Sequence, residues 1–309
     1  MQETITITET ENTLRIDVIA TERFKDISRS QWQKYGKFVL GGKEKKSKTK
    51  ASEGEEWELK YDPPGIFDGK LDPWEFPLRV LKETDDYVVI KKPVRISIHP
   101  SPSDPSQKTI VNALVHQFGA KHLSENSEEI DGQKIARPGI VHRLDKPTSG
   151  VLLVAKNNVA HKYFTDNWEK VEKIYFAMVT GTPPEKGNIE GEIIRDPKNR
   201  KRMTVMKSDK ARDARSSFEV LETGIGLGEG NGNGTLLKVQ IFTGRTHQIR
   251  VHLSSIGYSI VGDELYGGIP YKRLMLHAHS LTFPDPQTGE MVTVESGMPA
   301  EFSAKVQSK

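Results

Sequence analysis

The sequence predicts an α+β protein: a mixed, largely antiparallel sheet with flanking helices, preceded by a small basic α/β module. Two observations lead to this fold class. Runs rich in β-branched and aromatic residues recur at positions 87–90, 150–154, 174–179 and 236–242, and such runs are typical of strands. The segments between them do not repeat a regular strand–helix–strand unit, which argues against a doubly wound parallel sheet.

The chain divides naturally at a stretch rich in proline and glycine. Asp62-Pro63-Pro64-Gly65 cannot form a regular helix or an interior strand. We therefore expect an N-terminal domain over residues 1–62, a linker over 63–77, a catalytic domain over 78–300 and a tail over 301–309. A length of 309 residues suits one ordinary domain with a small accessory module.

Local signals outline the N-terminal module. Apolar and polar residues alternate over residues 5–8, as they do in a short strand. Ser28 is a suitable N-cap for a helix over residues 30–35, and Gly36 is suited to end it. Residues 38–40 then form a strand that enters a turn at Gly41-Gly42. The alternative is a charged helical hairpin packed on the main domain.

Absent residue types and signals narrow the chemistry and the location. The chain has no cysteine, which excludes disulfides, cysteine-ligated zinc or iron–sulfur sites and a thiolate nucleophile. His247 and His252 are five positions apart, and His277 and His279 have no nearby acidic partner, so we expect structural histidines and no metal. No signal peptide or apolar run of membrane-spanning length is present, so we expect a cytoplasmic protein without a membrane partner.

Positive charge is concentrated in two segments. Residues 23–50 contain ten lysines and arginines against two acidic residues, and residues 195–215 contain nine against three. Such clusters bind phosphates and release counterions, which predicts a nucleic-acid ligand. The candidate contacts are Arg29, Lys37 and Lys43 in the first segment and Arg200, Lys201 and Arg202 in the second. Two solvated loops are the alternative.

Residues 137–150 form a polar loop, rich in proline and glycine, directly before the apolar run at 151–154. Such a loop places its last polar side chains at the edge of a core, where partial desolvation alters reactivity. Asp145 is therefore a candidate nucleophile or base. By itself the pattern fits equally well a structural turn in which Asp145 caps backbone amides.

Three further segments are interpreted from pattern alone. Ile249, Leu253 and Ile256 have helical spacing before Gly257, so Arg250 is expected on a helix with one face in the core; a plain surface arginine is the alternative. Tyr175 lies in an apolar run, where an aromatic residue is ordinarily core. Residues 224–234 lack dinucleotide-binding spacing and are expected to form a hairpin loop.

The stretch His142-Arg143-Leu144-Asp145-Lys146-Pro147-Thr148-Ser149-Gly150 resembles the signature H-R-L-D-x-x-T-S-G of the RluA-type pseudouridine synthase family. Residues 173–177 are similar to the family's K-x-Y-x-A strand, and residues 244–252 match its G-R-T-H-Q-I-R-V-H segment. The resemblance spans residues 14–295 and implies the pseudouridine synthase catalytic fold. One departure is Arg95, where the family commonly has a glycine, which leaves the local turn geometry open.

The resemblance also implies roles for individual residues. Asp145 would be the required catalytic group, Tyr175 would lie against the target base, and Arg250 would pair with Asp145. Arg143 would fill the space that a flipped-out uridine vacates in the stack. His142 and Arg245 are expected to contact RNA, although a structural hydrogen bond is an equal alternative for His142.

The N-terminal module resembles the S-four-like RNA-binding domain. The matching stretches are Arg15-Ile16-Asp17, Ser28-Arg29-Ser30, residues 36–39 and Gly42-Lys43. It departs from the pattern at Gly41, where the family usually has asparagine, and in the lysine run at 43–50. The basic residues 195–215 fall where family members carry an RNA-gripping loop.

The expected reaction is the isomerisation of uridine to pseudouridine, which requires no cofactor and no metal. A carboxylate could attack the sugar, attack the base or remove a sugar proton to give a glycal, and the resemblance favours the last route. Large-subunit ribosomal RNA is the expected substrate, with transfer RNA as the alternative, and a monomer is expected. A non-catalytic RNA-binding assembly factor and a base-excising hydrolase are the competing functions.

Overall fold

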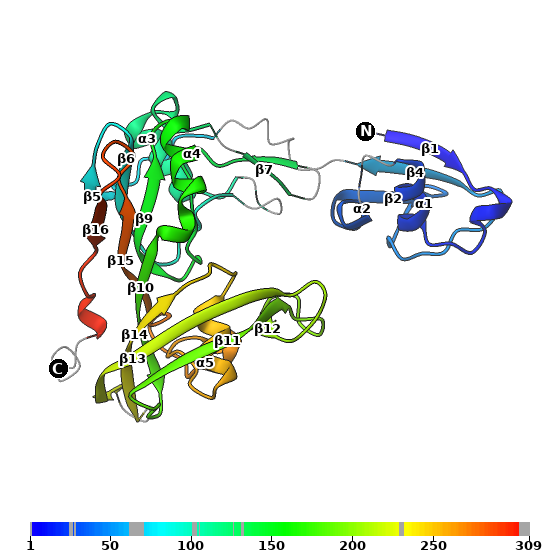
Figure 1. The fold of residues 1–309 in the computed structure, drawn as a ribbon. Coiled ribbons are helices and arrows are strands. Elements are labelled where there is room, and N and C mark those ends of the chain that lie inside the picture. Colours follow the sequence, from blue (N-terminus) through cyan, green and yellow to red (C-terminus); the bar gives the residue numbers. More distant parts are fainter. Residues whose placement is uncertain are drawn as a thin grey trace. The chain divides into compact units, whose positions relative to one another are not determined.

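The computed structural model describes residues 2–24, 27, 29–61, 71–100, 104, 106–125, 127–130, 133–228 and 232–302. The chain forms two compact units. Unit 1 comprises Met1–Leu71, Pro100–Gln107 and Ser127–Ala136, and unit 2 comprises Asp72–His99, Lys108–Asn126 and Arg137–Lys309. Elements are labelled as in Figure 1.

Unit 1 contains a four-stranded antiparallel sheet in the order β1-β4-β2-β3, together with two helices. The elements are β1 (Gln2–Thr6), α1 (Ile16–Arg23), α2 (Arg29–Tyr35), β2 (Gly36–Leu40), β3 (Lys43–Lys45) and β4 (Glu56–Tyr61). A short hairpin, β7 (Ser127–Ile130) and β8 (Gln133–Ala136), belongs to the same unit. The core is centred on Trp32 and Trp57, both fully buried, and it makes unit 1 a packed α/β module.

The helix predicted over residues 30–35, the strand over 38–40 and the turn at Gly41-Gly42 are all present in unit 1. Helix α2 ends where β2 begins at Gly36, and Gly41 and Gly42 form the β2–β3 turn with positive φ angles of 57° and 73°. A positive φ is accessible to glycine at little steric cost, which explains the pair at this position. The predicted N-cap, Ser28, lies outside the described residues.

Unit 2 is built on a ten-stranded sheet, counted over the described residues. Its order is β12-β11-β13-β14-β10-β15-β9-β6-β5, with β16 paired to β15. The strands are β5 (Arg79–Glu83), β6 (Tyr87–Lys92), β9 (Ser149–Ala155), β10 (Glu172–Thr180), β11 (Lys186–Arg195), β12 (Met203–Val205), β13 (Arg212–Gly226), β14 (Asn233–Ile241), β15 (Leu276–Pro284) and β16 (Met291–Glu295). All paired strands are antiparallel except β9 and β15. The predicted α+β class and the mixed, largely antiparallel sheet are confirmed.

Helices cover parts of this sheet. They are α3 (Ile110–Phe118), α4 (Asn158–Asp166) and α5 (Gln248–Ser255). Phe164 of α4 packs into a core with β6 and β9, and Val251 of α5 packs with β11 and β13 (Figure 1). No helix among the described residues has both the length and the apolar character needed to cross a membrane.

The hairpin predicted near residue 230 is present, but its loop is shorter than expected. We expected a loop over 224–234, whereas β13 continues to Gly226, β14 begins at Asn233, and the two strands pair antiparallel. Ile225 and Leu227 are 1% and 2% exposed, so burial of these two apolar side chains holds the glycine-rich backbone in the sheet. Tertiary packing therefore outweighs the weak local strand preference of glycine.

The expected linker and tail are partly packed against unit 2. Residues 62–70 lie outside the described part of the chain, but the Trp74 amide donates to the Asn112 carbonyl at 3.0 Å. Asn112 Nδ2 in turn donates to the Asp72 carbonyl at 2.8 Å. At the other end, Phe302 is fully buried, although the sequence placed it in the tail. Residues 72–77 of the expected linker and Phe302 of the expected tail therefore belong to unit 2.

The signature glycine Gly150 is required by the close approach of β9 to β15. Its φ is +124°, and a Cβ built there would lie 2.0 Å from the Ala278 carbonyl oxygen. We expect Gly150→Ala to lower the free energy of unfolding by about 3 kcal/mol, because the backbone cannot yield as a flexible side chain could. Urea denaturation measures the loss. Gly226→Ala, which meets no atom within 4 Å, is the control and should stay near wild type.

The β9–β15 junction also contains a buried neutral histidine. His277 Nε2 lies 3.0 Å from the Gly297 carbonyl, which can only accept, so Nε2 carries the proton and donates. His277 Nδ1 therefore accepts from the Ser149 hydroxyl at 2.8 Å, and Arg273 Nη2 donates to the same Ser149 Oγ at 2.6 Å. Burial lowers the pKa of His277 from 6.5 to about 3. Protonation would disrupt this arrangement.

That shift predicts a dependence of stability on pH. Below pH 6.5 the unfolded chain binds a proton at His277 that the folded chain does not bind until pH falls to about 3. Stability from this group is therefore lost as pH falls between these values. As pH falls, the free energy of unfolding should decline less steeply in His277→Gln than in wild type. The two slopes should differ by about 1.4 kcal/mol per pH unit. Urea denaturation from pH 7 to pH 4 tests this, and equal slopes would contradict it.

Candidate active site

A cavity of about 260 Å³ in unit 2 brings together the three predicted catalytic residues. Asp145, Tyr175 and Arg250 all line it, although they lie on a loop, on β10 and on α5. Apolar wall is supplied by Leu144, Ile241 and Leu276. The cavity therefore combines a carboxylate, a phenol and a guanidinium with apolar surface, as ligand sites do.

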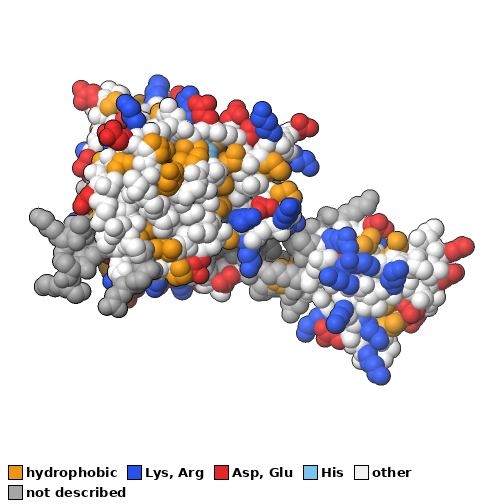
Figure 2. Space-filling view, turned by 90° about the horizontal axis from the view of Figure 1, so that it is seen from below, with side chains coloured by type: hydrophobic (Ala, Val, Ile, Leu, Met, Phe, Trp, Pro, Cys, Tyr) orange, Lys and Arg blue, Asp and Glu red, His pale blue; other side chains and the backbone are white. Residues whose placement is uncertain are grey.

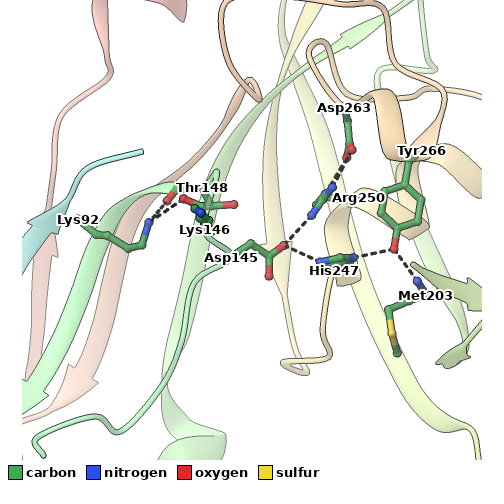
Figure 3. A network of polar contacts seen from close by, with 9 residues as sticks. All are labelled: Lys92, Asp145, Lys146, Thr148, Met203, His247, Arg250, Asp263 and Tyr266. Carbon is green, nitrogen blue, oxygen red and sulfur yellow. Dashed lines mark hydrogen bonds and ion pairs between the residues drawn. The ribbon is translucent and has the colours of Figure 1, made fainter. Parts of the chain in front are cut away.

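Asp145 occupies the turn that leads into β9. Its carbonyl accepts a hydrogen bond from the Thr148 amide at 3.0 Å, which closes the turn. Its side chain is 18% exposed, with Oδ2 lying 3.3 Å from Arg250 Nη1 and 3.8 Å from His247 Nε2. The carboxylate thus faces the cavity beside two nitrogen groups (Figure 3). Within the described part of the chain, its hydrogen bond is to the Arg250 side chain and none is to a backbone amide.

Arg250 is held by a second carboxylate that the sequence did not single out. Arg250 Nε and Nη2 donate to Asp263 Oδ2 and Oδ1 at 2.7 and 2.8 Å, which leaves Nη1 for Asp145. Burial acts to lower the pKa of Arg250, but the hydrogen bonds and charge of Asp263 and the charge of Asp145 raise it overall. Arg250 therefore stays cationic and is fixed in orientation by the bidentate pair.

His247 begins the turn before α5 with a left-handed backbone, φ 58°. Its Nδ1 lies 2.8 Å from Tyr266 Oη, and its ring meets that of Tyr266 edge-on. Burial lowers the pKa of His247, although the negative charge of Asp145 opposes the shift. His247 is thus a neutral ring beside the carboxylate, whereas the sequence suggested only a structural role for it.

Lys92 supports the Asp145 loop from beneath. It is fully buried at the end of β6, and Nζ donates to the Pro93 carbonyl at 2.8 Å. Nζ also donates to the carbonyls of Lys146 and Thr148 at 3.2 and 2.8 Å (Figure 3). Burial lowers the pKa of Lys92 to about 7, with the charge of Asp145 opposing that shift. Its two hydrogen bonds to Lys146 and Thr148 reach the loop on both sides of Pro147 and hold the segment that follows Asp145.

Tyr175 forms part of the cavity wall from the centre of the sheet. It pairs with Val239 of β14 and with Ala278 of β15, beside a bulge in the β10–β15 register. Its side chain is 9% exposed, and burial raises the pKa of its hydroxyl. The phenol is therefore neutral and forms part of the cavity lining.

The other predicted RNA contacts in unit 2 occupy different settings. Arg143 and Arg245 both line the cavity. Arg143 is exposed, whereas Arg245 is half-buried and its Nε donates to the Asp213 carbonyl at 2.9 Å. His142 Nε2 accepts the Leu153 amide at 2.9 Å, and burial lowers its pKa to about 3. The structural hydrogen bond considered for His142 is therefore present.

The turn between β11 and β12 carries the triplet Arg200, Lys201 and Arg202. Arg200 and Lys201 are exposed, and Arg202 Nε pairs with Asp196 Oδ2 at 2.6 Å. Since the Arg202 side chain is still 44% exposed, the turn presents a compact group of positive charge to solvent.

In unit 1, one predicted contact is tied to an internal acid. Arg15 and Arg29 both contact the carboxylate of Asp17, which is fully buried. Burial raises the pKa of Asp17, but its hydrogen bonds to Gln33, Arg15 and Arg29 lower it overall. Arg29 therefore helps to hold the fold of unit 1 through Asp17, and 46% of its side chain is also exposed to solvent.

The other predicted RNA contacts of unit 1, Lys37 and Lys43, are open to solvent. Lys37 lies on β2, and the lysine run from β3 onward is exposed at Lys43, Lys45, Lys46, Lys48 and Lys50. Figure 2 shows Lys and Arg side chains gathered on the visible face of this unit. Such a surface can bind a polyanion.

Sequence reasoning missed Asp263, Tyr266 and Lys92. The first two lie in Gly262-Asp263-Glu264-Leu265-Tyr266-Gly267, a polar and aromatic turn enclosed by glycines, and that pattern was the available signal. Arg95, which departs from the family's glycine, adopts φ 66°, so this turn keeps the left-handed geometry that glycine favours. Among the described residues no group of three or more His, Asp or Glu side chains is placed to hold a metal ion.

Comparison with known proteins agrees with this geometry. Residues 86–255 match the family model described as RNA pseudouridylate synthase. The chain is 37% identical to an uncharacterised RNA pseudouridine synthase of Aquifex aeolicus, over 94% of this chain and 92% of that protein. It is 33% identical to ribosomal large subunit pseudouridine synthase D of Zymomonas mobilis, over 75% and 72%. The solved structure of human RNA pseudouridylate synthase domain containing 1 superposes with a TM-score of 0.57 at 26% identity, covering 72% and 84%.

Proposed function

The chain belongs to the RluA-type RNA pseudouridylate synthase family and is an isomerase that converts uridine to pseudouridine, and we propose that Asp145 is its catalytic group. The observation that carries this proposal is the placement of the Asp145 carboxylate in the cavity, 3.3 Å from the Arg250 guanidinium. The guanidinium places an opposite charge and an N–H donor beside the carboxylate, and each chemical route considered for this reaction requires the carboxylate form.

The chemistry requires one bond exchange. The bond from the sugar to nitrogen 1 of uracil breaks, a bond from the sugar to carbon 5 forms, and the proton on carbon 5 is released while nitrogen 1 gains one. In the route we favour, Asp145 removes a sugar proton to give a glycal and later returns it. Tyr175 would cover the detached uracil and exclude water, so that the base is retained.

Arg143 and Arg245 would act at the entrance of the cavity. A uridine in structured RNA must leave its stack to reach Asp145. Arg143 is exposed beside the cavity, so we propose that it fills the space the uridine vacates. Arg245 and the Arg200, Lys201 and Arg202 turn would contact phosphates, which position the substrate without reading its sequence.

We propose large-subunit ribosomal RNA as the substrate. Support comes from the substrate named for the Zymomonas mobilis relative and from unit 1, which we propose is an S-four-like RNA-binding domain over residues 1–62, followed by a linker. Mapping pseudouridines in cytoplasmic RNA with and without the gene tests this. Loss of a site in large-subunit ribosomal RNA is expected, whereas loss confined to transfer RNA would contradict it.

The reaction itself is tested with RNA that carries tritium on carbon 5 of uracil. We expect the protein to act as a monomeric isomerase. An isomerase releases tritium while every uracil base stays attached to the RNA. Release of free uracil would indicate a hydrolase, and binding without tritium release would indicate an assembly factor. Sedimentation of the active fraction reports whether the active species is a monomer.

The lysine run of unit 1 gives a separate prediction. Replacing Lys43, Lys45, Lys46, Lys48 and Lys50 by glutamine should weaken RNA binding and reduce the slope of log affinity against log salt by about 0.9 for each phosphate that is no longer neutralised. The rate on a short, saturating substrate should change little, because Asp145 lies in unit 2. An unchanged salt slope would contradict a role in phosphate binding.

A further inference from the structure

A chain of polar contacts connects the cationic β11–β12 turn to the candidate catalytic carboxylate. Met203, the residue after Arg202, donates its amide to Tyr266 Oη at 2.7 Å. Tyr266 Oη lies 2.8 Å from His247 Nδ1, and His247 Nε2 lies 3.8 Å from Asp145 Oδ2 (Figure 3). The group that would bind phosphates and the group that would act on the sugar are thus joined through two side chains.

The direction of each proton in this chain can be deduced. The Tyr266 oxygen accepts the Met203 amide, and its own proton can go to His247 Nδ1, the other partner of that oxygen in the described part of the chain. Nδ1 then acts as an acceptor, so in the neutral ring the proton lies on Nε2. The opposite tautomer would turn an Nε2 lone pair toward the Asp145 carboxylate and is disfavoured by repulsion.

The environment keeps His247 neutral. Burial lowers its pKa, and the positive charges of Arg250 and Arg143 act in the same direction, while Asp145 and Asp263 oppose the shift. Tyr266 is itself buried, with 6% of its surface exposed, and its ring lies against the Arg250 guanidinium at 5.0 Å. Tyr266 therefore contacts both nitrogen groups that flank Asp145.

The last contact in the chain is longer than a hydrogen bond. At 3.8 Å, His247 Nε2 lies beyond the usual 2.7–3.2 Å range, and catalytic hydrogen bonds are often long until substrate is bound. The Met203 amide is positioned by the β11–β12 turn, in which the Asp196 amide donates to the Arg202 carbonyl at 3.1 Å. A displacement of this turn would therefore reach His247 through Tyr266.

We propose that Tyr266 is a positioning residue that couples phosphate binding by Arg200, Lys201 and Arg202 to the closure of the His247 Nε2–Asp145 contact. RNA on the turn shifts Met203, Tyr266 follows, and the His247 N–H moves into hydrogen-bond range of the carboxylate. Asp145 is then held by Arg250 and His247 together only when RNA is engaged. This inference rests on the proposed function and adds a substrate-dependent step to it.

The first test removes the Tyr266 hydroxyl from the full-length protein. Tyr266→Phe should lower the single-turnover rate at saturating RNA by about tenfold while the RNA dissociation constant stays unchanged. The control is Tyr87→Phe, which removes a buried hydroxyl that donates to Asp285 at 3.0 Å and lies outside the cavity lining. A wild-type rate in Tyr266→Phe, or the same loss in Tyr87→Phe, would overturn the proposal.

A second measurement reports on His247 directly. In isotopically labelled protein, the nitrogen chemical shifts of His247 should show a protonated Nε2 in wild type and a mixture of tautomers in Tyr266→Phe. Addition of RNA should shift the Nε2 signal in wild type but not in the variant. An RNA-induced shift of equal size in both proteins would overturn the coupling.

The coupling itself is measured by a double-mutant cycle. In the wild-type background, Arg200→Gln with Lys201→Gln should reduce both RNA affinity and the saturating rate, whereas in Tyr266→Phe it should reduce affinity alone. Additive effects on the rate would overturn the proposal. If wild-type protein releases no tritium the proposed function fails, whereas tritium release with additive rates rejects only the coupling.

Discussion

Asp145→Asn is expected to lower tritium release from labelled RNA by roughly 100- to 10,000-fold, the contribution typical of a positioned proton-transfer group. Asparagine has nearly the same shape and can still accept a hydrogen bond from Arg250, but it can neither take up a proton nor attack the sugar. RNA affinity should stay within about twofold of wild type, because phosphate contacts supply most of the binding energy. The assay is single-turnover tritium release together with RNA titration.

The control for this change is Asp166→Asn. Asp166 lies at the end of α4, exposed and paired with Lys162 at 2.7 Å, and its loss should leave the rate unchanged. If Asp145→Asn releases tritium as fast as wild type, the carboxylate has no chemical role and the proposed mechanism is wrong. If the variant loses RNA affinity in proportion to rate, Asp145 contributes to binding rather than to the reaction.

Arg250→Met is expected to cost about 3–5 kcal/mol of folding stability and to abolish turnover. The reason is that Asp263, with a side chain 1% exposed, and Asp145 would both lose their cation, and an uncompensated buried charge is strongly destabilising. Arg250→Lys keeps the charge without the planar donor fork, so it should recover part of the stability and little of the rate. Urea denaturation and tritium release are measured on the same samples.

Two further variants separate charge balance from chemistry. Arg79→Met removes an exposed arginine on β5 and should change stability by no more than about 0.5 kcal/mol. Arg250→Met combined with Asp263→Asn removes the buried acid together with its partner, so stability should recover while the reaction stays lost. A stable and active Arg250→Met protein would contradict the role proposed for Arg250.

Pattern and resemblance located the helix of Arg250 and the central strands accurately. Helical spacing from Ile249 to Gly257 predicted α5, and four β-rich runs predicted β6, β9, β10 and β14. These features depend on local periodicity, which one sequence contains. The hairpin around 224–234 was predicted, but its loop was drawn too wide, because the burial of Ile225 in the sheet extends β13 to Gly226.

The supporting residues of the site could not be predicted in the same way. Lys92 and Asp263 are 53 and 118 positions from Asp145 in the sequence, and nothing in their immediate neighbours specifies a partner. Lys92 ends an apolar strand and would ordinarily be a surface residue. Two of its three carbonyl acceptors, those of Lys146 and Thr148, come within reach only once β6 and β9 are paired.

By itself the sequence determined the fold class and, through its resemblance to known proteins, the family. The same resemblance predicted Asp145, Tyr175 and Arg250 as a catalytic set. These follow from short-range patterns, in which a few side-chain types at fixed spacing suffice. Tertiary structure alone decided that Asp263 holds Arg250, that Lys92 fixes the Asp145 loop, and that Tyr266 sets the tautomer of His247. Each of these depends on the direction of a hydrogen bond between distant segments, and that direction is fixed only when the sheet and α5 pack together.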